Sequence, residues 1–216
     1  MTFLPFPEPD ETARASFADE LAEVGFVMNG TRLWAFHPGL KDGLFALLGS
    51  LAREHDLDFR TRAILVTATA SSLGDSYCSV AWGTKLARET SAEHAAAALT
   101  GDDALLSPAE NALATWARKV VREPNATTAE DLEPLRQCGW TDRQIFGLTA
   151  FVALRIAFST VNDALGVRPD AEYHDLAPAA VLDALPAGRP LDSPRQADLP
   201  LESPRPADRP LESPRR

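Results

Sequence analysis

Hydrophobic and polar residues alternate along most of the chain with the period of an α-helix. One apolar stripe in the second half of the sequence is formed by Ile145, Leu148, Val152, Ile156 and Ser159. A repeat of three to four residues places such positions on one side of a helix. The stripe follows residues 141–144 (TDRQ), which have the form of a capping box, and it ends before Gly166. We therefore predict a long helix here.

Other helix starts and ends are marked by equally local signals. Residues 107–110 (SPAE) combine a capping box with proline at the first helical position, which predicts a helix over 111–122. Residues 127–130 (TTAE) predict the start of a further helix, and Gly139 predicts its end.

The remaining apolar stretches also favour helix over strand. The alanine-rich segments 44–53 and 92–99 have high helix propensity. Only residues 63–70 (AILVTATA) contain enough β-branched side chains to suggest a strand. Because the residues around them lack hairpin turn signals, we predict a buried helix instead. The fold class predicted from the pattern is all-α.

The C-terminal end of the chain has a different composition. From Arg189 a ten-residue unit is repeated almost three times as RPLDSPRQAD, LPLESPRPAD and RPLESPRR. Frequent proline is incompatible with helices and sheet ladders, and leucine alone buries too little surface to offset chain entropy. We therefore divide the chain into an N-terminal arm (1–19), a helical domain (20–185) and a disordered repeat tail (186–216).

Charge and cysteine content exclude several classes of protein. The chain has 21 basic and 31 acidic residues, a net charge of −10, whereas nucleic-acid binders cluster Lys and Arg. Its longest apolar run lies within residues 145–154, well short of the roughly 20 residues of a membrane span. Two cysteines, Cys78 and Cys138, are too few for a disulfide framework. We expect a cytoplasmic protein with free thiols and neither nucleic-acid nor membrane partners.

Cys78 is the first candidate for a reactive residue. Gly74 ends one predicted helix and Asp75 is a good N-cap for the next, so Cys78 falls at the third helical position. Unpaired amides and the helix dipole lower the pKa of a thiol placed there, whereas an ionised Asp75 raises it. These effects are of similar size, about 0.3 to 1 kcal/mol each. Both a reactive thiol and a small buried apolar side chain therefore fit the sequence.

The other polar candidates are less specific. Arg155 lies between apolar neighbours on the long helix and, with Asn162 and Asp163, either lines a polar pocket or forms a structural hydrogen-bond network. The four histidines lack metal-ligand spacing. His55 and His94 lie near predicted helix ends, where we expect solvation or capping. No nucleotide-binding or phosphate-binding motif occurs, so we predict no metal and no cofactor.

Two segments carry a resemblance to a known family. Residues 60–87 (RTRAILVTATASSLGDSYCSVAWGTKLA) resemble the core of the carboxymuconolactone decarboxylase and alkylhydroperoxidase D-like family. Residues 158–167 (FSTVNDALGV) resemble the closing helix of that family, and the likeness covers about residues 20–170. It implies an alkylhydroperoxidase D-like helical bundle built around the two helices that flank Gly74, usually assembled as a homo-oligomer.

The resemblance also assigns roles to individual positions. Peroxidase members of the family carry a glutamate, then a Cys-x-x-Cys pair, then, after three more residues, a histidine. Cys78 matches the attacking cysteine, and Asp75 stands where the resolving cysteine would be. Trp82 replaces the histidine and Ala63 replaces the glutamate. Tyr77 keeps the aromatic residue that commonly precedes the attacking cysteine. The site is thus a degenerate form of the family's motif.

Three functions follow from these observations. We rank first a weak antioxidant peroxidase of the alkylhydroperoxidase type, with Cys78 and Asp75 as catalytic residues acting on a small hydroperoxide. Because no resolving thiol is present at position 75, it would need an external thiol reductant. The pocket residues would be Tyr77, Trp82 and Arg155. The alternatives are a carboxymuconolactone decarboxylase-type lyase acting on a small carboxylate or lactone, and a catalytically inactive oligomeric scaffold.

Overall fold

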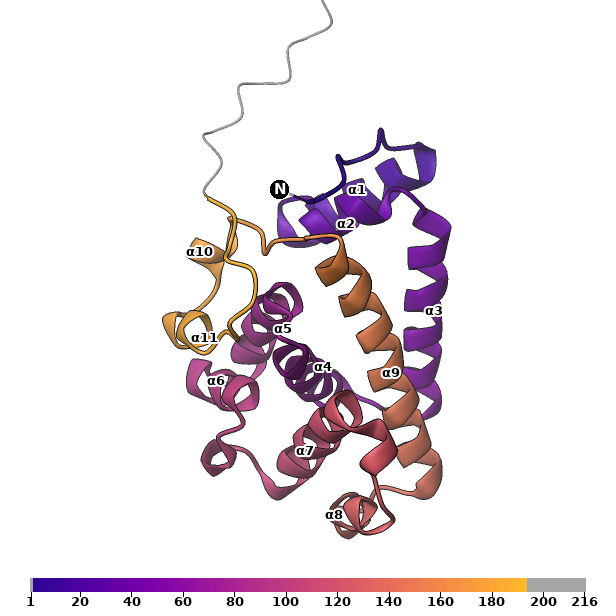
Figure 1. Ribbon diagram of the computed structural model, residues 1–216, viewed down its shortest axis with the longest axis vertical. Helices are drawn as coiled ribbons and strands as arrows, with labels where there is room; N and C mark the ends of the chain where they lie inside the picture. The colour runs from indigo at the N-terminus through magenta and orange to yellow at the C-terminus, as the bar shows by residue number, and fades with distance from the viewer. Residues whose placement is uncertain (1, 194–216) are drawn as a thin grey trace, which may run out of the picture.

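The protein is built from α-helices. The computed structural model describes residues 2–193, and within this range no strand occurs (Figure 1). The helices are α1 (Glu11–Val24), α2 (Asn29–Trp34), α3 (Pro38–Glu54), α4 (Phe59–Leu73), α5 (Ser76–Glu89), α6 (Ala92–Thr100), α7 (Pro108–Arg122), α8 (Glu133–Gln137), α9 (Asp142–Ala164), α10 (Tyr173–Leu176) and α11 (Ala179–Asp183). Short 3-10 turns cover Asp103–Leu105, Pro124–Ala126 and Glu130–Leu132. The all-α prediction is confirmed, while the predicted disordered tail lies, from residue 194 onward, outside the described residues.

Helix α4 is the centre of the fold. It packs against α5, α6, α7 and α9, which surround it in Figure 1. Every residue of Ala63–Ala70 is buried. The segment that suggested a strand is therefore the buried helix predicted from its flanks. Its lack of a polar face follows from contact with neighbours on all sides.

The turn between α4 and α5 places the candidate cysteine. Gly74 has a φ of +77°, a left-handed conformation that favours glycine, and its amide bonds the last carbonyls of α4. Asp75 then caps α5, and Cys78 is the third residue of that helix, as predicted. The turn that joins α4 and α5 was therefore predicted correctly from the local sequence between Gly74 and Cys78.

The predicted capping boxes have different outcomes. Those of α7 and α9 are present, with both reciprocal hydrogen bonds formed. The predicted helix start at 127–130 is wrong. The Asp131 carboxylate accepts a hydrogen bond of 2.7 Å from the Thr128 amide, and the chain forms 3-10 turns before α8 begins at Glu133. Gly139, with a φ of +92°, ends this region as predicted.

Helix α9 is unusually apolar. It is the one helix of the described chain that is long and apolar enough to cross a membrane by length and composition. Its buried side, which includes Leu148 and Val152, packs against α3, α4 and α7. This is the packing of a core helix, and it accounts for the apolar stripe seen in the sequence.

The two ends of the described chain pack near the end of α9 and the start of α5. At the N-terminal end, the Phe3 amide donates a hydrogen bond of 2.9 Å to the carbonyl of Leu165, just after α9. At the other end, residues 186–192, here called the C-terminal strap, pass over the start of α5. The Ser76 hydroxyl donates a hydrogen bond of 2.6 Å to the Arg189 carbonyl.

These contacts bear on the predicted division of the chain. Helix α1 begins at Glu11, inside the segment 1–19 that was predicted as an arm. The C-terminal strap, inside the predicted tail 186–216, is hydrogen-bonded to the helical body. The boundaries of the predicted domain 20–185 stay a prediction, but ordered structure extends beyond them at both ends.

Candidate functional site

Cys78 lies in the interior, at the first turn of α5. Only 2% of the residue is exposed. Its amide donates a hydrogen bond of 2.8 Å to the Asp75 carboxylate, which is the N-cap interaction predicted from the sequence. The second carboxylate oxygen of Asp75 is buried and has no hydrogen-bond partner among residues 2–193. The thiol and the carboxylate therefore share a site from which bulk water is excluded.

Arg155 reaches the same site from α9. Its guanidinium donates through Nη2 to the Cys78 sulfur at 3.4 Å. The guanidinium carbon lies 5.5 Å from the centre of the Trp82 ring and 5.0 Å from that of Phe158, within the range of cation–π attraction. Within the described chain Arg155 has no carboxylate partner, and its Nε atom has no hydrogen-bond acceptor. A buried cation thus has a thiol and two aromatic rings as its neighbours.

The ionisation of Cys78 is decided by opposing effects. Burial raises the pKa of the thiol well above its ordinary value, and the Asp75 carboxylate raises it further. The Arg155 guanidinium and a hydrogen bond from Ser159 act in the opposite direction but are weaker. In this closed arrangement the thiol is protonated at neutral pH. The sequence analysis considered the helix dipole and Asp75, whereas burial has the largest effect on this pKa in the structure.

The other predicted pocket residues have separate roles. The Tyr77 hydroxyl accepts a hydrogen bond of 3.2 Å from the amide of Gly30 at the start of α2. A Cβ at Gly30 would lie 2.5 Å from that hydroxyl, so glycine is needed for this approach. Trp82 stacks on Phe59 at 6.1 Å and covers Arg155. Of the five predicted site residues, the structure brings together Cys78 and Asp75 with Trp82 and Arg155, and it directs Tyr77 towards α2.

Helix α9 adds polar groups that the sequence did not link to Cys78. Ser159 lies one turn after Arg155 on α9 and hydrogen-bonds Cys78. The spacing of the two α9 residues is visible in the sequence, but nothing local indicates that Cys78 is their common partner. Asn162, fully buried, accepts a hydrogen bond of 2.8 Å from the indole of Trp34. Burial and the nearby Asp75 raise the pKa of Asp163 to about 7, although Arg189 opposes this. Arg155, Asn162 and the Asp163 carbonyl thus bond three different partners, Cys78, Trp34 and Arg189. None of these bonds joins the three residues to one another, so a polar pocket and a structural network both stay predictions.

The side chains of His55 and His94 are packed against neighbouring helices. His55 is buried against Gly147, where an added Cβ would lie 2.3 Å from the imidazole. His94 bonds Glu110 through Nε2 at 3.0 Å. His55 is the C-cap residue of α3, as the expectation of capping allows, but its imidazole is buried and not solvated. The His94 side chain is also largely covered and contacts a carboxylate of α7. No cluster of three or more potential metal-binding side chains occurs among residues 2–193.

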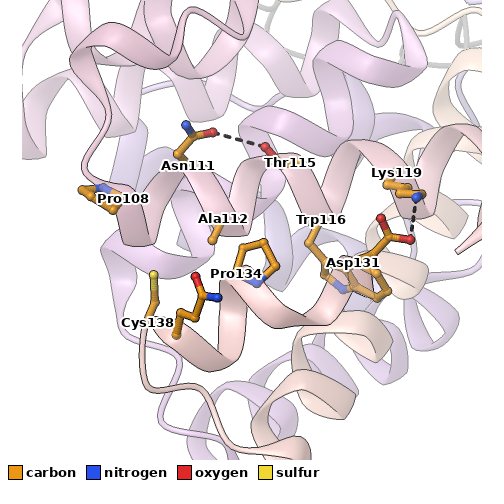
Figure 2. A pocket seen from close by; sticks show the side chains of 10 residues that line it. Pro108, Asn111, Ala112, Thr115, Trp116, Lys119, Asp131, Pro134 and Cys138 are labelled. Carbon is orange, nitrogen blue, oxygen red and sulfur yellow. Dashed lines mark hydrogen bonds and ion pairs between the residues drawn. The ribbon is translucent and has the colours of Figure 1, made fainter. Parts of the chain in front are cut away.

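The second cysteine belongs to a different surface feature. Cys138 is exposed and lines a groove of about 380 Å³. Figure 2 shows this groove between α7 and the segment that contains α8, with Trp116 and Pro134 among its lining residues and the Lys119–Asp131 ion pair beside it. None of the predicted site residues lines this groove. Cys138 is therefore no part of the Cys78 site in the single chain.

Known structures with the same fold include proteins related to peroxidases. An uncharacterized peroxidase-related protein from Ralstonia eutropha JMP134, described as an alkylhydroperoxidase AhpD core, is 25% identical; the match covers 80% of this chain and 94% of that one, with a TM-score of 0.72. A peroxidase-related protein from Silicibacter sp. TM1040 is 23% identical over 81% and 94% of the two chains, also with a TM-score of 0.72.

A third structure shares the fold at lower similarity. The debrominase Bmp8 is 18% identical over 81% of this chain and 92% of that one, with a TM-score of 0.62. No protein-family profile and no curated protein matches the chain. The likenesses show an alkylhydroperoxidase D-like helical fold, and the first supports the predicted family.

Proposed function

We propose that this chain, which has the fold of the alkylhydroperoxidase D-like family, is a peroxidase-type oxidoreductase that uses Cys78 as its single peroxidatic thiol. The observation that carries the proposal is the buried Arg155 guanidinium, whose only hydrogen-bonding contact within the described chain is the Cys78 sulfur. A cation held against a thiol stabilises the thiolate, which is the nucleophilic form. A merely structural cysteine has no need of such a partner.

The reaction would proceed in two parts. The Cys78 thiolate attacks the outer oxygen of a hydroperoxide and breaks the O–O bond, which gives a sulfenic acid and an alkoxide. The alkoxide takes up a proton and leaves as the alcohol. Arg155 faces the sulfur and would stabilise the negative charge before and during this displacement. No metal or cofactor takes part in the scheme.

Regeneration needs a thiol from outside the site. One external thiol condenses with the sulfenic acid to a mixed disulfide and releases water, and a second thiol displaces Cys78 as the thiol. Asp75 replaces the family's resolving cysteine and caps α5. Both cysteines are free, which suits the thiol-rich cytoplasm in which we place the protein.

The raised pKa of Cys78 predicts a slow enzyme. Asp75 hydrogen-bonds to the amide of Cys78 and disfavours the thiolate, so it would set the pKa of the nucleophile rather than act as its base. Without the family's glutamate and histidine, the acid–base help that typically contributes about 10² to 10⁴ in rate is missing. We infer a weak peroxidase whose cysteine becomes reactive when the site opens.

A second function is favoured by the same arginine. A buried guanidinium without a carboxylate partner would also bind the carboxylate of a small acid or lactone, as the lyase alternative requires. In that case Cys78 would be dispensable. An inactive scaffold would show neither activity.

The deciding experiment measures hydroperoxide consumption with a small dithiol as reductant. We expect slow turnover that is abolished by Cys78→Ser and retained by Cys138→Ser, the matched control. Turnover that survives Cys78→Ser would exclude the thiol mechanism. Absence of turnover together with thermal stabilisation by muconolactone-like acids, lost in Arg155→Met, would favour the lyase.

A further inference from the structure

The C-terminal strap is fixed to the two helices that carry the candidate site. On α5, the Ser76 hydroxyl bonds the Arg189 carbonyl. On α9, the Asp163 carbonyl accepts a hydrogen bond of 3.0 Å from the Arg189 guanidinium. The same guanidinium lies 4.7 Å from the centre of the Phe3 ring. One residue of the strap therefore bridges α5, α9 and the N-terminal end of the described chain.

The fit of the strap depends on a glycine. A Cβ at Gly188 would lie 2.3 Å from the Gly74 carbonyl oxygen and 3.0 Å from the Ser76 side chain. The φ of Gly188 is not in the left-handed region, so close approach rather than conformation requires glycine here. Any side chain at this position would push the strap away from the start of α5.

The strap lies over the turn that leads into the Cys78 site. Gly74 and Ser76, the residues that it touches, flank Asp75, which is completely buried. Cys78 lies in the same turn of α5 and is equally enclosed. A hydroperoxide and an external thiol must both reach the sulfur, so part of this enclosure has to open. The strap is held by the bonds of Arg189 and, at Asp192, by bonds to Asn29, the Pro169 carbonyl and Arg168. Because it contains no helix of its own, the part around Gly188 opens more easily than packed helices do.

We propose that the C-terminal strap is a removable cover that holds Cys78 in a closed, unreactive state and lifts to admit hydroperoxide and thiol. The proposal rests on the proposed function of Cys78 and assigns its regulation to residues 186–192. Its test uses alkylation of the thiol and needs no peroxide turnover. The cover proposal can therefore fail while the peroxidase proposal stands, or hold while the peroxidase proposal fails.

The test compares alkylation of Cys78 by iodoacetamide in a Cys138→Ala background. Gly188→Ala should displace the strap, and we expect alkylation to be about tenfold faster, as loss of one or two ordinary hydrogen bonds allows. Gly43→Ala is the matched control, because a Cβ at this glycine of α3 meets nothing within 4 Å. It should react at the parent rate.

A pair of shortened chains gives the same comparison without a substitution. A chain that ends at residue 185 lacks the strap, and one that ends at residue 193 keeps it. We expect faster alkylation in the first only. Cys78 can be exposed by local opening of the strap or by global unfolding. The urea dependence of the alkylation rate distinguishes these two routes, because local opening exposes little surface and global unfolding exposes much.

Two results would overturn the proposal. One is that Cys78 is alkylated no faster than in the parent, both in Gly188→Ala and in the chain that ends at residue 185. The other is a faster rate that rises with urea as steeply as global unfolding, because alkylation would then report a destabilised fold rather than a lifted cover.

Discussion

At the residue scale, the central feature is a buried arginine paired with a thiol instead of a carboxylate. Removing a charge from water is costly unless the charge is paired. Here Trp82 and Phe158 contact the guanidinium, and the Cys78 sulfur accepts its one hydrogen bond within the described chain. Such an arrangement lowers the stability of the folded protein. We interpret it as retained for the chemistry of Cys78.

The first prediction concerns this pair. Arg155→Met removes the cation but keeps much of the volume, so the pKa of Cys78 should rise further. One pKa unit corresponds to about a tenfold lower thiolate fraction near neutral pH, and we expect alkylation of Cys78 to slow by about that factor. Arg155→Lys, which keeps the charge, should slow it less. Equal rates in the parent and Arg155→Met would contradict the pairing.

The second prediction concerns Asp163. Burial, together with Asp75, raises its pKa from 3.8 to about 7 in the folded protein. Between about pH 4 and pH 7 the folded protein therefore keeps a proton that the unfolded chain has released, and stability falls as pH rises through this window. Asp163→Asn should remove this part of the slope and stabilise the protein at pH 8 by about 1 kcal/mol, after allowance for partial exposure. Urea unfolding between pH 4 and pH 8 measures it, and an unchanged slope would argue against the shift.

At the scale of the elements, one carboxylate joins three helices. Glu110 of α7 accepts hydrogen bonds from Arg60 of α4 at 2.7 Å and from Ser107 in its own capping box, and it contacts His94 of α6 at 3.0 Å. Although burial opposes ionisation, these partners lower the pKa of Glu110 to about 2. The cluster fixes α6 and α7 on the central helix.

The third prediction follows from this junction. Because the folded pKa lies below the ordinary value of 4.5, the stabilisation is present above about pH 4.5 and is lost as pH falls towards 2. Glu110→Gln should cost about 2 kcal/mol at pH 7 and much less at pH 3. Thermal unfolding at the two pH values measures the difference. Glu133→Gln is the control, since its ion pair with Arg136 is exposed and should matter little. A cost that does not change with pH would refute the electrostatic explanation.

At the scale of the whole molecule, α3 and α9 lie side by side (Figure 1) and leave large apolar side chains in solvent. Phe146 of α9 is 69% exposed and Leu47 of α3 is 57% exposed. Phe36, just before α3, and Leu40, in its first turn, are exposed as well. Exposed apolar patches of this kind mark interaction surfaces. The predicted homo-oligomer would cover them with a second copy of the chain.

The fourth prediction tests that assembly. We expect the parent to be an oligomer in light scattering, and Phe146→Glu with Leu47→Glu to shift it towards the monomer, because a charge in an apolar interface is desolvated without a partner. Leu176→Glu, on α10, is the matched control and should leave the mass unchanged. A monomeric parent at micromolar concentration would contradict the prediction.

Much of the fold was predictable because its signals are local. The capping boxes of α7 and α9 and the turn from Gly74 to Cys78 depend on contacts within about four residues, and so do the residue types that form them. The predicted helix start at 127–130 was wrong because of another local contact. The Asp131 carboxylate accepts a hydrogen bond from the Thr128 amide, and this bond competes with helix formation.

The sequence by itself determined the capped helices α7 and α9, the buried character of α4 and the place of Cys78 at the start of α5. Only the tertiary structure decided that Arg155, 77 residues further along, reaches the sulfur and that the strap near residue 189 covers the start of α5. It also decided that burial is the largest influence on the pKa of Cys78. Those contacts join segments far apart in the chain. Their existence depends on how the helices pack, and no local pattern of residues records it.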